Sequence, residues 1–302
     1  MLNTPLPNVS IYITAWALLI FFNKLGFIEG ANIFTFTLQS YFIAFILLGI
    51  FVLPRKWQEI KTIPFSIFLW TLLAGVVHVG IGSLLSQTGL QLTSAINAGF
   101  LMQFTTVTTT VLAWITLKEK MNISKIITIF IIISGTFLLV TKGQGLKKIS
   151  IGDLAILLAC ICWSISAILT KKTLRHSSIS PEVLSFFRPA VGIPILILFL
   201  IFSPLYPLPL RSIFHFDIFN FRFLPLVLLA GFCSVCVWVF SNRTLKVASA
   251  SYLTMMNSTT PVLVTILALF FLKETIDRVQ FLGIALILLG NLQTHYLKIE
   301  KH

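Results

Sequence analysis

The sequence predicts an all-α integral membrane protein with ten transmembrane helices arranged as two inverted five-helix repeats. Hydrophobic residues make up 57% of the 302 residues and charged residues only 10%, whereas soluble domains carry about 25% charged residues. Apolar runs of roughly 20 residues recur, the length of an α-helix across a hydrocarbon core about 30 Å thick. The same three letters, Leu-Lys-Glu, end two of these runs, at 117–119 and 272–274. The alternating pattern of an outer-membrane β-barrel is absent.

Ten apolar segments are expected to form the helices, and several begin at a residue that favours a helix start. Asn122, Ser150 and Asp277 are expected to be the N-caps of the fifth, sixth and tenth helices. The first apolar run has no basic segment before it, so it is expected to be a retained helix rather than a secretory signal. The expected helices span residues 9–28, 32–53, 64–88, 94–117, 123–141, 152–170, 182–203, 221–241, 250–272 and 278–297.

The net charge of +13 is explained by basic residues that lie between the apolar runs, so no nucleic-acid partner is expected. With the N-terminus in the cytoplasm, thirteen Lys and Arg residues fall in inner loops and eight in outer loops. This bias predicts a multi-pass protein of the cell inner (plasma) membrane with both termini cytoplasmic. The expected partners are the lipid bilayer and a small-molecule substrate, and a homodimer is left open. All four cysteines lie in apolar runs, where packing is favoured over a metal pair, and no cofactor or metal is expected.

An internal repeat explains why Leu-Lys-Glu occurs twice. When Glu119 is aligned on Glu274, residues 90–135 match residues 245–290 without a gap and with 14 identities in 46 positions. Further upstream, Trp16 precedes Lys24 by eight residues, as Trp163 precedes Lys171. Residues 1–141 and 150–298 are therefore expected to be two five-helix repeats. Because five is odd, the repeats must face opposite ways, a construction that secondary transporters use.

Two short patterns support a resemblance to a known family. Small-residue turns, Thr93-Ser94-Ala95 and Ala248-Ser249-Ala250, each precede a helix that ends in Leu-Lys-Glu, and Asn-Ser-Thr-Thr-Pro-Val occupies 257–262. Over nearly the whole chain, this arrangement resembles the EamA branch of the drug/metabolite transporter superfamily. The resemblance implies a permease that moves small organic metabolites, often as efflux across a bacterial inner membrane. The first half departs from the pattern, because Thr106 replaces the proline found at Pro261, and its helix is expected to be less bent.

The fourth and ninth helices carry the first group of candidate substrate-binding residues. Polar groups inside a bilayer are costly and often functional, and in an inverted repeat equivalent faces are expected to meet around a shared cavity. The alternative is that Ser and Thr join neighbouring helices by hydrogen bonds of about 0.6 kcal/mol. These candidates are Gln103, Thr106, Thr110, Asn257, Ser258 and Pro261.

Three further candidates lie on other helices. His78 could take up a proton or bind substrate, or it could be a satisfied structural group. Arg188 could bind a substrate carboxylate or phosphate, or its side chain could extend to the lipid headgroups. Trp163, like Trp16 and Trp238, lies within a span and could wall a pocket for a planar substrate or pack in the core.

Four charged residues at helix ends are expected to have structural roles. Lys24 and Lys171 are expected to be interfacial anchors. Glu119 and Glu274 each follow a helix C-terminus and are expected to fix the turns there.

The function expected from these features is secondary transport by alternating access. No catalytic residue is expected. No Asp or Glu falls in the middle of a span, so facilitated diffusion or exchange is favoured, with proton coupling through His78 as the alternative. The expected cargo is amino acids or related compounds, exported or exchanged. The alternatives are a multidrug or lipophilic-compound exporter and, less favoured, a membrane-embedded enzyme or a channel, since no nucleophile motif or filter loop is visible.

Overall fold

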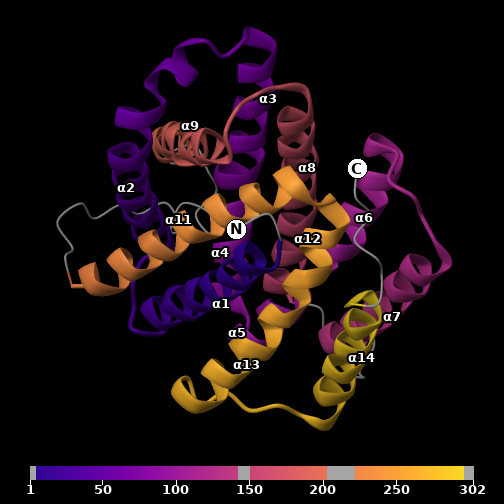
Figure 1. The fold of residues 1–302 in the computed structure, drawn as a ribbon. Helices are drawn as coiled ribbons and strands as arrows, with labels where there is room; N and C mark the ends of the chain where they lie inside the picture. Colours follow the sequence, from indigo (N-terminus) through magenta and orange to yellow (C-terminus); the bar gives the residue numbers. More distant parts are fainter. Residues whose placement is uncertain (1–4, 142–149, 203–221, 296–302) are drawn as a thin grey trace.

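The structure, a computed structural model, describes residues 5–141, 150–202 and 222–295, which are helical without strands (Figure 1). The first half contains α1 (Pro5–Ile28), α2 (Ile33–Lys61), α3 (Phe65–Gly75), the π-helix η1 (Val76–Gly82), α4 (Ser83–Leu92), α5 (Ala95–Leu101), α6 (Phe104–Leu117) and α7 (Ile123–Thr141). The second half contains α8 (Ile151–His176), α9 (Pro181–Ile201), α11 (Leu224–Val247), α12 (Ala250–Met256), the short 3₁₀ helix η5 (Asn257–Thr259), α13 (Thr260–Phe271) and α14 (Arg278–His295).

Within these ranges, eight helical segments are long and apolar enough to cross a membrane. Three of them are composite, because each joins several of these helices. They are Phe65–Leu92 (α3, η1 and α4), Ala95–Leu117 (α5 and α6) and Ala250–Phe271 (α12, η5 and α13). Shorter apolar stretches, Lys125–Leu138 and Arg278–Gly290, lie in α7 and α14. The chain is therefore a multi-pass membrane protein built from α-helices.

The second helix is longer than the sequence predicts. The expected end near residue 53 is wrong, because α2 continues through Pro54 to Lys61. Its extension is held by Glu59, whose carboxylate accepts hydrogen bonds from the backbone N–H and the hydroxyl of Ser180, just before α9. A proline can stay in a helix when neighbouring contacts offset its lost hydrogen bond.

The helical runs that follow the small-residue turns are interrupted in both halves. Between α5 and α6 the backbone N–H of Gln103 donates to Phe100 O at 3.0 Å, and that of Thr106 donates to Gln103 O at 2.8 Å. These i→i−3 bonds are the tighter 3₁₀ type, and η5 lies at the aligned place in the second half. Pro261 is therefore not needed for the interruption, since the first half is interrupted with Thr106 in its place.

The two halves pack into each other rather than side by side. The contacts that join α1 to α11 and α13, α2 to α9 and α11, α4 to α8, α6 to α8 and α12, and α7 to α14 all cross between the halves. Figure 1 shows α7 and α14 lying together at one edge of the molecule. A cavity between the halves is consequently lined by helices from both.

The predicted N-caps are confirmed. The side chain of Asn122 accepts from Lys125 N at 2.9 Å. Ser150 forms a capping box with Asp153, and Asp277 and Gln280 accept from each other's backbone N–H groups. These reciprocal bonds satisfy helix N–H groups that would otherwise have no intrahelical partner.

Both Leu-Lys-Glu boundaries adopt the same backbone conformation. Lys118 and Lys273 have φ of 55° and 54°, and they are the non-glycine residues with positive φ in the described chain. After each lysine, the backbone N–H of the glutamate donates to a helical carbonyl, Glu119 to Ala113 O at 3.2 Å and Glu274 to Ala268 O at 3.3 Å. A left-handed residue followed by such a bond is a common helix C-terminus, so the repeated motif specifies a helix stop.

Close packing of η1 against α9 positions the candidate site. A Cβ added to Gly80 would lie 2.7 Å from Ile195 Cγ2, and one added to Gly192 would lie 2.0 Å from Val79 Cγ1. Only glycine fits at such distances. The approach brings His78, on η1, next to Arg188, on α9, and π-helical turns are frequent at functional sites.

Candidate functional site

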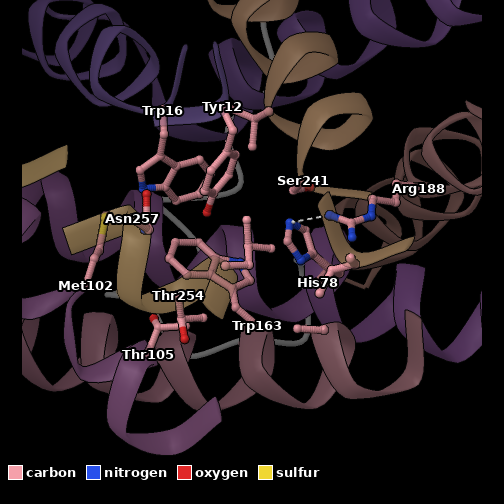
Figure 2. A pocket seen from close by; sticks show the side chains of 14 residues that line it. Tyr12, Trp16, His78, Met102, Thr105, Trp163, Arg188, Ser241, Thr254 and Asn257 are labelled. Atoms are coloured by element: carbon pink, nitrogen blue, oxygen red, sulfur yellow. Dashed lines mark hydrogen bonds between the residues drawn. The ribbon is translucent and has the colours of Figure 1, made fainter. Parts of the chain in front are cut away.

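A cavity of about 60 Å³ lies between the two halves (Figure 2). It has room for on the order of four water molecules. Its walls come from α1, η1, the α5–α6 interruption, α6, α8, α9, α11, α12 and η5. The lining residues are Tyr12, Trp16, His78, Met102, Thr105, Trp163, Ala167, Arg188, Val237, Ser241, Leu245, Leu253, Thr254 and Asn257.

Arg188 is the charged residue in this lining, and its partners are neutral. The side chain is only 6% exposed. Its Nη2 donates to Asn242 Oδ1 at 2.9 Å, and its Nη1 lies 3.4 Å from His78 Nε2. The ion pairs of the described chain join Lys56 to Glu59 and Arg243 to Glu182, so neither neutralises Arg188. Burying a charge without a counterion is expensive, and the cavity is therefore suited to an anion.

Asn242 holds the guanidinium in place. Its Nδ2 donates to Ser185 Oγ at 2.9 Å and to Pro181 O at 3.5 Å, while its Oδ1 accepts from Arg188. Asn242 lies on α11, and its Nδ2 is bonded to the first turns of α9. These bonds orient its Oδ1 toward Arg188. The guanidinium is thus preorganised before any ligand enters.

His78 presents a free hydrogen-bonding nitrogen. Arginine can only donate, so the contact with Arg188 assigns Nε2 of His78 as the acceptor and Nδ1 as the protonated nitrogen of a neutral ring. The Nδ1 atom is buried and has no hydrogen-bond partner in the part of the chain that the structure describes. A ligand in the cavity could accept this bond.

Aromatic rings form another wall of the cavity. The ring centroids of Trp16 and Trp163 are 5.1 Å apart in an edge-to-face arrangement, and Tyr12 lies 6.4 Å from Trp16. His78 lies 6.0 Å from Trp163. Figure 2 shows these rings gathered around the centre of the cavity. Such faces attract apolar groups and also cations, through the ring quadrupole.

The structure brings together four of the residues that the sequence suggests for substrate binding. His78, Trp163, Arg188 and Asn257 all line the cavity. The burial of Arg188 contradicts the alternative in which its side chain extends to the lipid headgroups.

Four other candidates are buried away from this lining. Gln103, Thr106 and Thr110 are each 1% exposed, and Pro261 is buried within α13. Thr106 instead donates to Thr254 O at 3.1 Å, joining the two halves. The side chain of Ser258 lies outside the described residues. The cavity face of the first-half helix is formed by Met102 and Thr105, each one position before Gln103 and Thr106.

Tyr12, Ser241 and Thr254 line the cavity but are not among the sequence candidates. Tyr12 could have been found from its i, i+4 spacing to Trp16 on one helix face. Ser241 and Thr254 carry no such signal in the sequence. In the structure both hydroxyls also donate to carbonyl oxygens of their own helices.

Each repeated glutamate caps a helix of the opposite half. Glu119 accepts from Ala250 N at 3.1 Å and from Ser251 Oγ at 2.6 Å, at the start of α12. Glu274 accepts from Ala95 N at 2.7 Å and Ile96 N at 3.0 Å, at the start of α5. The expectation that these carboxylates fix their own turns is corrected, because they satisfy N–H groups of helices more than 130 residues away.

The two repeated lysines cap helices within their own halves. Lys24 Nζ donates to Leu90 O at 2.9 Å and Thr93 O at 2.5 Å. Lys171 Nζ donates to Leu245 O at 2.6 Å and Ala248 O at 2.7 Å. These bonds satisfy the carbonyls at the ends of α4 and α11, and they replace the interfacial anchoring expected from the sequence.

Comparison with known proteins agrees with this architecture. The chain is 26% identical over 220 residues to the uncharacterized transporter YyaM of Bacillus subtilis (strain 168), covering 72% of this chain and 69% of that protein. It is 25% identical over 264 residues to an uncharacterized transporter of Clostridium kluyveri, covering 84% and 82%. A solved crystal structure shares the fold, with a TM-score of 0.68, 16% identity and 96% of both chains covered. The EamA-like transporter family matches residues 8–141 and 150–294, so this chain belongs to that family.

Proposed function

We propose that this transporter is a secondary carrier that exports or exchanges amino acids or related carboxylate-bearing metabolites by alternating access. The carboxylate binds at Arg188 in the cavity between the halves. The remaining atoms lie against the aromatic wall. The protein works in the cell inner membrane with both termini in the cytoplasm, as the distribution of Lys and Arg between the loops favours.

The proposal includes ten spans, with α7 and α14 as the fifth and tenth, and an inverted relation between residues 1–141 and 150–298. Paired contacts support it. Glu119 caps the second half as Glu274 caps the first, and Lys24 and Lys171 bond to aligned carbonyls, those of Leu90 and Leu245. Equivalent contacts at the two ends of the bundle are what exchange between two conformations requires.

The observation that carries the proposal is a buried cation that has no carboxylate partner among the described residues. Arg188 lines the cavity, is held by the neutral Asn242 and His78, and is 6% exposed. A planar guanidinium matches the two oxygens of a carboxylate. A bound carboxylate would neutralise the charge and could also accept from His78 Nδ1.

The aromatic wall and Asn257 suit the rest of an amino acid. Trp16, Tyr12 and Trp163 offer ring faces to an ammonium group or an apolar side chain. Asn257 Oδ1 already accepts from Thr260 Oγ1 at 2.6 Å, which orients its amide beside the cavity. A zwitterion would thus find a cation for its carboxylate and ring faces for its ammonium.

A multidrug or lipophilic-compound exporter is the second candidate, because the same aromatic wall would hold an apolar compound. Under that function the charge of Arg188 would remain unneutralised by the cargo. Substitution of Arg188 therefore separates the two candidates, since it would weaken only carboxylate transport.

The test is counterflow in proteoliposomes without an ion gradient. Vesicles are loaded with unlabelled amino acids, nucleosides and S-adenosylmethionine, and entry of each labelled compound is followed. We expect saturable entry of amino acids, and we expect Arg188→Gln to lower its efficiency at least about 30-fold, since truncating one partner of a buried charged pair costs about 2–5 kcal/mol. Arg243→Gln is the matched control, because Arg243 lies at the surface in an ion pair with Glu182. Equal activity of the Arg188→Gln and Arg243→Gln variants would refute the proposal.

A further inference from the structure

A second cavity of about 30 Å³ adjoins the first. Four residues line both cavities and form the boundary between them, namely Trp16, His78, Met102 and Trp163. The second cavity has room for on the order of two water molecules. Its lining contains no Lys, Arg, Asp or Glu within the described chain. Its other polar lining residues are Asn23, Tyr41, Ser83, Ser86, Gln87 and Ser234.

The two cavities occupy corresponding places in the repeat. The offset of 155 that aligns Glu119 with Glu274 also aligns Leu90 with Leu245 and Ser86 with Ser241. Leu245 and Ser241 line the first cavity, whereas Leu90 and Ser86 line the second. The first cavity is therefore lined by positions of the second half, and the second cavity is lined by the aligned positions of the first half.

At the next pair of aligned positions, the amide oxygen has a hydrogen-bond partner in the second half but none among the described residues in the first. Gln87 aligns with Asn242, whose Oδ1 accepts from Arg188 at 2.9 Å. Gln87 is 8% exposed and lines the second cavity, and its Oε1 is buried without a hydrogen-bond partner among the residues described. Leaving such an oxygen unpaired costs free energy that a bound group would recover.

The group that fits there is uncharged and hydrogen-bonding. An amide side chain can donate and accept, and the serine hydroxyls around it can do both. A charged group would find no counterion in this lining, and a purely apolar group would leave Gln87 Oε1 unpaired. The second cavity thus differs from the first, where Arg188 selects a carboxylate.

We propose that the second cavity is the far end of the same substrate site and that it binds an uncharged polar group, an amide or a hydroxyl, of the substrate whose carboxylate lies at Arg188. This inference rests on the proposed function. The substrate would pass between the cavities beside Trp16 and Trp163, which line both. The preferred cargo is then an amino acid with a polar, uncharged side chain.

The test compares compounds of similar shape that differ in one polar group. Glutamine is paired with homoleucine, and asparagine with leucine, and competition for saturable counterflow is measured for each. We expect the wild-type protein to prefer the polar member of each pair. We expect Gln87→Met to lower that preference about 10-fold, because it removes a hydrogen-bonding amide while it keeps the length of the side chain.

Gln103→Met is the matched control. Gln103 is also a buried amide whose oxygen and nitrogen have no hydrogen-bond partner in the described ranges, but it lines neither cavity. Its substitution should leave the preference unchanged. An equal loss in both variants, or a wild-type protein that transports the four compounds without preference, would overturn the inference and leave the proposed function intact. Absence of saturable transport of all four compounds would overturn the inference, and the proposed function would fall with it only if the wider counterflow test also finds no carboxylate that enters.

A sodium ion is the other occupant that hydroxyl and amide oxygens could hold, so the counterflow is repeated with sodium replaced by N-methylglucamine. We expect no change. A requirement for sodium that disappears in Gln87→Met would overturn the inference, because the cavity would then be an ion site.

Discussion

Replacing Glu119 by glutamine should destabilise the protein without altering the transport site. Glu119 is 2% exposed and accepts from Ala250 N at 3.1 Å and Ser251 Oγ at 2.6 Å. Hydrogen bonds to a charged group are about 1 kcal/mol stronger than neutral ones, and a carboxylate at a helix N-terminus adds about 0.5–1 kcal/mol. Two such bonds and one helix start predict a loss of about 2–3 kcal/mol.

The assay is thermal stability of the purified protein in detergent, followed by the amount of folded protein on size exclusion. A loss of this size predicts a fall in Tm on the order of 5 °C and less folded protein, whereas counterflow per folded molecule should stay within about twofold of the wild type. Glu29→Gln is the control, since the Glu29 side chain is exposed. Normal folded yield with abolished counterflow would refute the assignment of Glu119 as a cap.

Three further substitutions test the packing. Lys171→Met should lower the Tm measurably, because it removes two bonds to helix-end carbonyls. Lys172→Met should lower it less, because it removes only a cation–π contact with Trp70; equal effects would contradict the capping role. Lys118→Gly should preserve or raise the Tm and Lys118→Val should lower it, since φ is 55° there; the reverse order would exclude the left-handed conformation. Gly192→Ala should cost about 1–3 kcal/mol of stability through overpacking, because the added Cβ would meet Val79. Gly49→Ala should be tolerated, because its added Cβ would make ordinary contacts at 3.7 Å. Equal Tm values for the two variants would contradict the close packing of η1 on α9.

Much of the helical pattern could be predicted because it follows from local composition. Apolar length predicts spans, and Asn122, Ser150 and Asp277 predict helix starts that the structure confirms. The repeat could be detected because a helix stop with a left-handed lysine and a capping glutamate requires the same short motif each time. The cross-half partners of those glutamates could not be predicted, since they depend on how the halves interlock.

Apart from Trp163, the candidate site was predictable where a residue is costly inside a membrane. His78, Arg188 and Asn257 stand out for that reason, and all three line the cavity. Gln103 stands out equally but does not line the cavity, where Met102 and Thr105 lie instead. Helical periodicity shows which residues share a face, but which face points into the cavity depends on how the halves pack.

The most direct measurement is competition between a carboxylate and the corresponding carboxamide for binding to the purified protein. An amino acid and its amide differ little in size, so they differ mainly in whether they can neutralise Arg188. We predict that the wild-type protein binds the carboxylate at least about 30-fold more tightly and that Arg188→Gln abolishes this preference. Equal affinity of the wild-type protein for the two compounds would contradict the assignment of Arg188 as the carboxylate-binding residue.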